Sequence, residues 1–384
     1  RPPIQAQPPN ALTINAIIAR TRRIASLQLA TTMKHNWEYK RLGDVCKLCV
    51  GGDKPADISE IQNSDNSIPV FSNGIENEGL YGYCKKSTIQ EPSVTISGRG
   101  TLGVPFIRRN PFVPIVRLVV ATPDYSLRLE YLYYWLLFRK FSGNGAAIPQ
   151  LTVPMIRNEV IPVPPIEVQE RIVAELDKIN EVVEDCRELL RNLNALAQSL
   201  FYDTFGDPVS NPKCWTFKQI KSLLSLKAGK SIKASELLNH ITDGYYPCYG
   251  GNGIRGYISK KSHHGLYNII GRQGALCGNI TLANGDFYAT EHAVVVSPLI
   301  ESSPYWLYYM LSALNLNKYA KGVAQPGLSV GVINEISIPV PPLALQQRFA
   351  TQVEAIEAQK ANVEATIAEM QTLLASRMDY WFND

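Results

Sequence analysis

The sequence predicts an α+β protein formed by tandem duplication, in which each copy contains a globular domain and a long helix. The stretch IPVPP at residues 161–165 recurs at residues 338–342, which is 177 positions further on (338 minus 161). A long amphipathic helical pattern follows each stretch, and short strand-like runs bounded by Gly, Asn and Pro precede it. Repetition in this order indicates one structural unit that is used twice.

The expected strands form two matching sets. They lie at residues 68–71, 80–83, 94–97, 104–108 and 113–120 in the first copy, and at 246–249, 257–259, 268–270, 280–282 and 293–296 in the second. One helix follows each set, at residues 127–141 and 304–314. We therefore expect each globular domain to be a curved, mostly antiparallel sheet with helices packed on it.

The helical pattern after each IPVPP stretch has apolar residues at alternating spacings of four and three, as in a coiled-coil seam. The predicted seam consists of Ile172, Leu176, Ile179, Val183, Leu190 and Leu193 in the first helix, and of Phe349, Val353, Ile356, Val363, Ile367, Met370 and Leu374 in the second. Each helix alone would expose this stripe, so we expect the two to pack as an antiparallel coiled coil with pseudo-two-fold symmetry. Lys360 and Arg377 also fall on the second stripe, where we expect either fraying or contact with another protein.

This organisation gives five expected segments. They are an N-terminal extension at 1–33, a globular domain at 34–150, a hinge and long helix at 151–207, a second globular domain at 208–326, and a second hinge and helix at 327–384. Residues 1–32 contain no acidic residue, and we expect Met33 to be the natural start. We assign no function to the extension.

Composition indicates a globular protein with a mild basic bias. Of the 384 residues 45% are hydrophobic and 19% are charged, and the net charge is +4. That charge permits a polyanionic partner without requiring one. The seven cysteines have no regular spacing, which favours free thiols in a reducing compartment. Cys46 and Cys49 form a lone CxxC, which we interpret as small apolar residues and not as a zinc site.

Motifs that resemble catalytic or cofactor sites lack the context that such sites need. Residues 98–103 satisfy GxGxxG, but a strand-like run follows them where a dinucleotide site needs a helix. Gly229-Lys230-Ser231 resembles the end of a phosphate-binding loop, yet Leu224 occupies the position of its first glycine. The five histidines form no metal-binding pattern. We therefore expect no catalytic residue, no metal site and no cofactor in this chain.

Residues that could contact nucleic acid recur at matched places in the two copies. Glycine-flanked arginines can approach a base edge or the backbone, and lysine pairs beside a tyrosine suit phosphates. The candidates are Arg99 with Arg272, Lys85 and Lys86 with Lys260 and Lys261, Tyr83 with Tyr257, and Asn73 with Asn252. The alternative is a solvated face for the lysines and a plain hairpin turn for each Asn-Gly. Residues that read different sequences should differ between the copies, so matched residues favour a positioning or folding role.

Taken together, these features resemble one family, the specificity (S) subunit of type I restriction–modification systems. The resemblance covers residues 34–384 and rests on the two IPVPP hinges, on Gln169-Glu170-Arg171 and Gln346-Gln347-Arg348, and on the phrases Gln150-Leu151-Thr152 and Gly327-Leu328-Ser329.

The resemblance implies two target-recognition domains, each recognising one half of a bipartite sequence in double-stranded DNA. It implies that the two long helices set the unread spacer and dock two methyltransferase subunits, and that restriction subunits join the full complex. Catalysis, ATP, S-adenosylmethionine and magnesium would then belong to those partners, in the cytoplasm of a bacterium or archaeon.

Three alternatives stay open from the sequence. The chain could be a coiled-coil adaptor whose globular ends bind proteins. It could be an enzyme that uses the loop at Gly98 or the loop at Gly229 to bind a nucleotide. It could also be the recognition subunit of a type IIB enzyme or of a related methylation-based phage-defence system.

Overall fold

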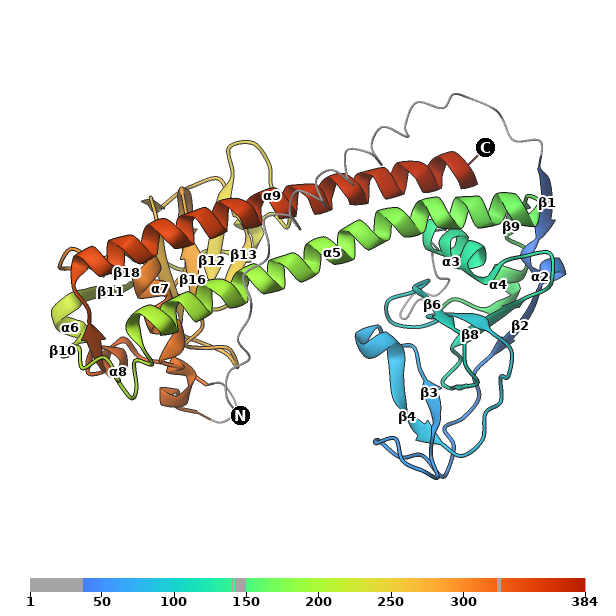
Figure 1. The fold of residues 1–384 in the computed structure, drawn as a ribbon, viewed down its shortest axis with the longest axis horizontal. Coiled ribbons are helices and arrows are strands. Elements are labelled where there is room, and N and C mark those ends of the chain that lie inside the picture. Colours follow the sequence, from blue (N-terminus) through green and yellow to red (C-terminus); the bar gives the residue numbers. More distant parts are fainter. Residues whose placement is uncertain (1–36, 140, 142–149, 323–325, 384) are drawn as a thin grey trace. The chain divides into compact units, whose positions relative to one another are not determined.

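The computed structural model describes residues 37–139, 141, 150–322 and 326–383. These residues form two compact units, the first from residues 37–187 with 364–383 and the second from residues 188–363. Each unit holds one globular domain and part of each long helix (Figure 1). The predicted extension at 1–33 lies outside the described residues.

The first unit contains three sheets. Strands β1 (Glu38–Arg41) and β9 (Val160–Val163) form a two-stranded sheet. The large sheet has the order β2 (Cys46–Val50), β8 (Val119–Pro123), β5 (Ser93–Ile96), β6 (Pro105–Arg108). The small sheet has the order β4 (Leu80–Cys84), β3 (Ile68–Phe71), β7 (Val113–Pro114). All pairs are antiparallel except β3 with β7. The helices of this domain are α2 (Leu42–Val45), α3 (Leu129–Phe138), α4 (Val153–Arg157) and the short η2 (Glu76–Gly79).

The second unit repeats this strand order and adds one strand, β14, to the small sheet. Strands β10 (Thr216–Gln219) and β19 (Ser337–Val340) form its two-stranded sheet. The large sheet has the order β11 (Leu224–Ala228), β18 (Ala293–Pro298), β15 (Tyr267–Gly271), β16 (Ile280–Ala283). The small sheet has the order β13 (Gly253–Ile258), β12 (Tyr246–Gly250), β17 (Asp286–Ala289), β14 (His263–His264). Its helices are α6 (Ile220–Leu223), η3 (Ala234–Glu236), α7 (Pro304–Ala313), η4 (Leu316–Tyr319) and α8 (Val330–Asn334). The parallel pair β12–β17 corresponds to β3–β7. The predicted fold class, α+β by tandem duplication with long helices, is confirmed.

One predicted strand is divided in the structure. Residues 113–120 read as a continuous strand, but β7 and β8 belong to different sheets. The chain changes sheet through Val116 and Arg117, whose φ angles are 53° and 61°. Propensity alone could not show this turn, because both residues are otherwise compatible with a strand.

A buried glutamine joins each hinge to its globular domain. Gln169 is 0% exposed; its Oε1 accepts the N–H of Arg128 at 2.8 Å, and its Nε2 donates to the carbonyls of Ser126 and Pro164, both at 2.8 Å. Gln346, 2% exposed, accepts the N–H of Ser303 and donates to the carbonyl of Pro341. Since Arg128 and Ser303 are the N-cap residues of α3 and α7, each amide fixes a long helix to the first turn of a domain helix.

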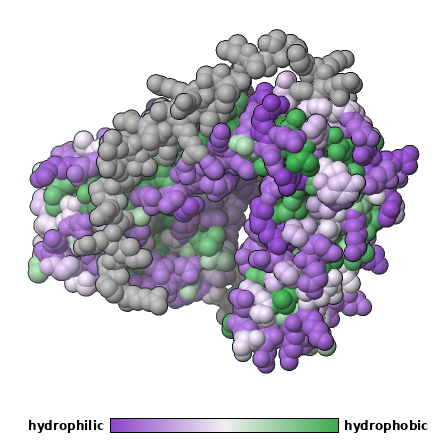
Figure 2. Space-filling view, turned by 45° about the vertical axis from the view of Figure 1, so that its right-hand side comes forward, coloured by the Kyte–Doolittle hydropathy of each residue, from purple (hydrophilic) through white to green (hydrophobic). Residues whose placement is uncertain are grey.

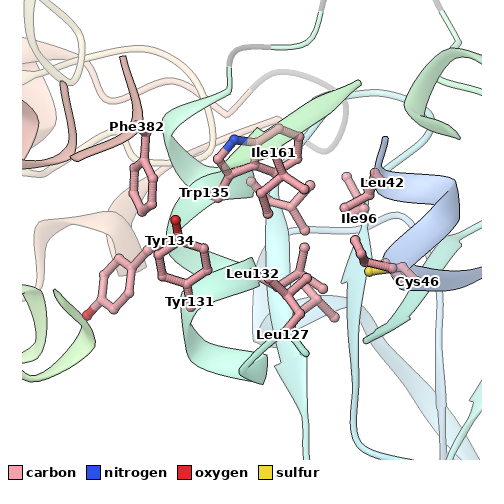
Figure 3. Packing of buried hydrophobic residues seen from close by; sticks show 14 of the residues in the cluster. Leu42, Cys46, Ile96, Leu127, Tyr131, Leu132, Tyr134, Trp135, Ile161 and Phe382 are labelled. Atoms are coloured by element: carbon pink, nitrogen blue, oxygen red, sulfur yellow. The ribbon is translucent and has the colours of Figure 1, made fainter. Parts of the chain in front are cut away.

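The core of the first unit forms where α3 meets the sheet, the hinge and the end of the second long helix. Figure 3 shows Tyr131, Leu132 and Trp135 of α3 among Ile96 and Ile161, with Phe382 beside them. The rings of Tyr131 and Phe382 lie 5.4 Å apart. In the second unit Phe205 and Phe349 pack 5.2 Å apart in the equivalent core.

The long helices are α5 (Ile166–Phe205) and α9 (Leu343–Phe382), each of 40 residues. In the second unit Phe201 of α5 contacts Phe349 of α9, and Gln198 lines the same groove as Glu357. The residue number falls along α5 as it rises along α9, so the segments run antiparallel there. Figure 1 shows the two helices side by side within each unit.

Most predicted seam residues are buried. Ile172, Leu176, Ile179, Val183, Leu193, Phe349, Val353, Ile356, Val363 and Met370 are buried, whereas Leu190, Ile367 and Leu374 are half-buried. Leu189 and Leu373 are buried one position before two of the latter. An α-helix has 3.6 residues per turn, so a strict 3.5-residue stripe drifts around its surface.

The two polar seam positions are both paired. Arg377 donates through Nε and Nη2 to the carboxylate of Glu175 on α5, and the indole of Trp381 donates to the same carboxylate at 3.2 Å. Lys360 pairs along its own helix with Glu357 at 2.9 Å. Arg377 therefore links the two helices within the first unit, which explains a charge on an apolar stripe.

The first prediction concerns the buried glutamine. Gln169→Ala should lower the free energy of unfolding by about 2–4 kcal/mol, because the N–H of Arg128 loses its acceptor and two carbonyls lose their donor. Denaturant titration of the purified chain measures this. Arg171→Ala, at an exposed position of the same motif, should change it by less than about 0.5 kcal/mol. Equal effects of the two variants would contradict the role given to Gln169.

The second prediction concerns the pair between the helices. A double-mutant cycle of Glu175→Ala and Arg377→Ala should give a coupling of about 1 kcal/mol, since both side chains are mostly buried. The exposed pair Glu184–Arg187 is the matched control and should give a coupling near zero. Similar couplings for both pairs would show that Arg377 does not hold the helices together.

Candidate nucleic-acid interface

In the first unit the structure brings Asn73 and Arg99 together. The N–H of Gly98 donates to Oδ1 of Asn73 at 2.7 Å, and Nδ2 of Asn73 donates to the carbonyl of Val116 at 2.7 Å. A Cβ on Gly98 would lie 3.1 Å from the carbonyl oxygens of Arg117 and Leu151, so the turn favours glycine. The Asn73 amide is thus occupied by the backbone and positions the turn that carries Arg99.

The guanidinium of Arg99 is only partly satisfied by the described residues. The residue is half-buried, and its Nε is buried without a hydrogen-bond partner in the part of the chain that the structure describes. An unsatisfied cationic donor of this kind is costly unless another molecule supplies an acceptor.

The second unit builds a related turn around Arg272. The N–H of Gly271 donates to the carbonyl of Asn279 at 3.0 Å, and the side chain of Asn279 donates to Oδ1 of Asn252 at 3.0 Å. A Cβ on Gly271 would lie 1.8 Å from the carbonyl oxygen of Gly251, so no other residue fits. In both units a hairpin connection of the small sheet therefore packs against a Gly-Arg turn.

The two lysine pairs differ in their surroundings. Lys85 and Lys86 are exposed, and no ion pair to either occurs among the described residues. Lys260 lies 2.7 Å from Glu236, and Lys261 lies 2.9 Å from Asp286. The hydrogen bond from Lys261 lowers the pKa of the Asp286 carboxyl group, and a second bond from His264 lowers it further. The second pair is therefore partly neutralised by its own domain.

The tyrosines beside these lysines serve the fold as well. Tyr83 exchanges backbone hydrogen bonds of 2.8 Å with Ser59, and Tyr257 does the same with Leu238 at 2.8 and 2.9 Å. Both side chains are half-buried. Tyr83 also lines a groove of about 630 Å³ on the small sheet, together with Phe71, Asn77 and Glu78.

A second groove, of about 660 Å³, lies within the second unit between α7, β16 and the two long helices. Tyr305, Tyr308 and Tyr309 line it with Glu357. Burial, followed by the charge of Glu357, raises the pKa of the Tyr308 hydroxyl. In the first unit Tyr134, the counterpart of Tyr309, is instead held by Asp177 at 2.6 Å and Asn180 at 2.9 Å.

The loop that resembles a phosphate-binding loop uses two of its backbone donors within the domain. The N–H of Gly229 donates to the carbonyl of Ala293, and the N–H of Lys230 donates to that of Ala289, both at 3.1 Å. A Cβ on Gly229 would lie 2.0 Å from the Ala289 oxygen, so close packing accounts for this glycine. The GxGxxG turn leads into β6, as its strand-like context predicts.

No cluster of three or more His, Cys, Asp or Glu side chains suited to a metal occurs within the described residues. Of the CxxC pair, Cys46 is buried, which raises the pKa of its thiol to about 12, and Cys49 is half-buried. Among the described helices none is both long and apolar enough to span a membrane. Figure 2 shows hydrophilic side chains over much of the visible face.

Sequence analysis missed Arg108. Its side chain is 5% exposed, and its guanidinium lies over the ring of Phe71 at 3.6 Å and bonds to Glu78. An arginine at the end of a strand-like run is the only signal in the sequence, because its partners lie about 30 residues away.

Comparison with known proteins gives the family. The family described as type I restriction modification DNA specificity domain matches twice, at residues 34–193 and 212–371. The type I restriction enzyme EcoprrI specificity subunit of Escherichia coli is 48% identical over 130 residues, which cover 34% of this chain and 32% of that protein. The MjaIX specificity subunit of Methanocaldococcus jannaschii is 22% identical over 376 residues, covering 83% of this chain and 86% of that protein.

A crystal structure of the type I restriction–modification S subunit from M. genitalium shares the fold, with a TM-score of 0.58, 16% identity, and coverage of 93% of this chain and 98% of that one. The alignments to the first curated relatives span only 32% to 47% of those proteins. Because the family matches most of the chain in two copies, this protein belongs to the type I restriction–modification DNA specificity domain family.

Proposed function

We propose that the chain is the DNA sequence-recognition subunit of a type I restriction–modification complex and carries no catalytic residue of its own. The observation that carries the proposal is the double match to a DNA specificity domain, on two units with the same strand order. In this proposal the globular domains at 34–150 and 208–326 each recognise one half of a bipartite target.

The long helices provide the spacer in this proposal. Each is continuous over 40 residues and contributes to both units. A helix rises about 1.5 Å per residue, so its length sets a distance that loops could not hold. The hinge-and-helix segments 151–207 and 327–384 would dock two methyltransferase subunits, and restriction subunits would complete the complex in the cytoplasm.

Electrostatics supports DNA contact at the Gly-Arg turns. Arg99 is a half-buried cation on a glycine turn, and Lys85 and Lys86 are exposed cations in the same domain. Exposed ion pairs such as Lys260–Glu236 contribute little stability, so a phosphate can replace the carboxylate at low cost. The mild basic charge of the whole chain fits such local contacts.

The arginines give a direct test. Arg99→Ala and Arg272→Ala should each weaken target-DNA binding by the assembled methyltransferase about 5- to 30-fold, and lower the slope of log affinity against log salt by about 1 if a phosphate is contacted. Fluorescence anisotropy at several salt concentrations measures both quantities. Lys213→Ala, at an exposed position of the second domain outside the helices and the Gly-Arg turns, is the control. Unchanged affinity and salt dependence would leave both arginines with only a structural role in their turns.

The spacer gives a second test. Removing one heptad from α5 and one from α9 should shorten the unread gap by about 3 base pairs, since seven residues span about 10 Å and a base pair about 3.4 Å. Single-molecule methylation mapping of cells expressing the variant reports the two half-site sequences and the length of the unread gap separately. Changed half-site sequences with an unchanged gap would refute the proposal that the helices set the spacer length.

A further inference from the structure

The two units differ most at one connection of the small sheet. In the second unit β12 ends at Gly250 and β13 begins at Gly253, so two residues connect them. In the first unit β3 ends at Phe71 and β4 begins at Leu80, and residues 72–79 form a loop between them. Two domains that recognise different base sequences must differ in the residues that contact the bases, so this longer loop is a candidate base-reading element.

The loop holds a strained backbone. Asn77 and Glu78 have φ angles of 46° and 53°, and Gly79 follows at 78°. Successive left-handed residues other than glycine are unfavourable and persist where surrounding contacts impose them, often at binding sites. The loop is closed at its base, because the N–H of Ser72 donates to the carbonyl of Gly79 at 2.8 Å.

Arg108 imposes this conformation. Its Nη1 donates to Oε2 of Glu78 at 2.9 Å, its Nη2 donates to the Glu78 carbonyl at 2.5 Å, and its Nε donates to Thr95 at 3.1 Å. Burial lowers the pKa of Arg108 to about 10, which still leaves it charged at neutral pH. Burying a cation is costly, and strand register places Ala283 at the matched position of the second unit. Arg108 therefore serves the loop and not the shared fold.

The loop presents an amide beside a groove. Asn77 is exposed and lines the 630 Å³ groove with two further amides, Gln62 and Asn110, and with the rings of Phe71 and Tyr83. The Glu78 carboxylate is already paired with Arg108, so the exposed Asn77 amide is the group that the loop offers to a base edge. An asparagine amide matches the N6 donor and N7 acceptor of adenine in the major groove.

Resting on the function proposed above, we propose that the loop of residues 72–79 is a base-reading element of the first domain, in which Asn77 contacts an adenine and Arg108 is a positioning residue. The start of the loop supports this placement. Asn73 ties it to the Gly98 turn, so the loop and the unsatisfied guanidinium of Arg99 share one framework. In this proposal Arg99 would contact the DNA backbone while the loop contacts a base.

Methylation mapping of the assembled complex tests the loop. Asn77→Ala should relax one adenine position in one half of the word, while the other half and the gap stay as in the wild type. Arg108→Lys keeps the charge but not the forked bonds, and it should relax the same half. Gln90→Ala, an exposed amide of the same domain outside the groove, should change nothing. If the Asn77→Ala complex methylates the same target sequence as the wild type, the proposal is overturned.

A binding measurement separates this outcome from a failure of the proposed function. In a set of duplexes, 7-deazaadenine replaces one adenine of the mapped target sequence at a time, which removes the N7 acceptor at that position. One substitution should weaken wild-type binding about 5- to 100-fold and leave binding by the Asn77→Ala complex unchanged. If every position affects both complexes equally, Asn77 does not read adenine. If the wild type deposits no bipartite methylation, the proposed function itself is wrong.

Discussion

The structure of each unit depends on one buried amide at the start of a long helix. Gln169 and Gln346 use both ends of their side chains, accepting from the first turn of a domain helix and donating to the proline-rich hinge. A salt bridge at the surface would yield to water, but a buried amide with satisfied partners has one low-energy position. Within a unit, the direction of the helix is therefore fixed against the domain, which is the requirement for a helix that measures distance.

Repetition made much of this fold predictable. Most predicted strands and both domain helices lie close to their expected residues, because two diverged copies confirm each other's pattern. Eight of the described strands were not expected: β1, β9, β10 and β19 pair the start of each domain with its hinge, β2 and β11 carry charged or polar residues among apolar ones, β14 has only two residues, and β17 follows a short Asn-Gly turn. The break at Val116 and Arg117 depends on which sheet each strand joins, and that is a tertiary constraint.

The candidate interface was predictable in its residues but not in their surroundings. Recurrence pointed to Asn73 and Arg99, yet only the coordinates show the asparagine consumed by backbone groups and the arginine left with an unsatisfied nitrogen. Matched lysine pairs likewise differ, since carboxylates from distant strands neutralise one pair and not the other. A spacing in one sequence contains no information about such partners.

Duplication separates what a domain needs from what it can vary. Glycines packed against a carbonyl, as at Gly51 and Gly229, occur in both units because the same sheets must meet there. The loop of residues 72–79 and the buried Arg108 occur in one unit, although a buried cation and a strained backbone both oppose folding. Two copies share the fold equally, so a costly feature confined to one of them is best explained by a task that the other does not perform. For two domains that divide a bipartite target, that task is the choice of bases.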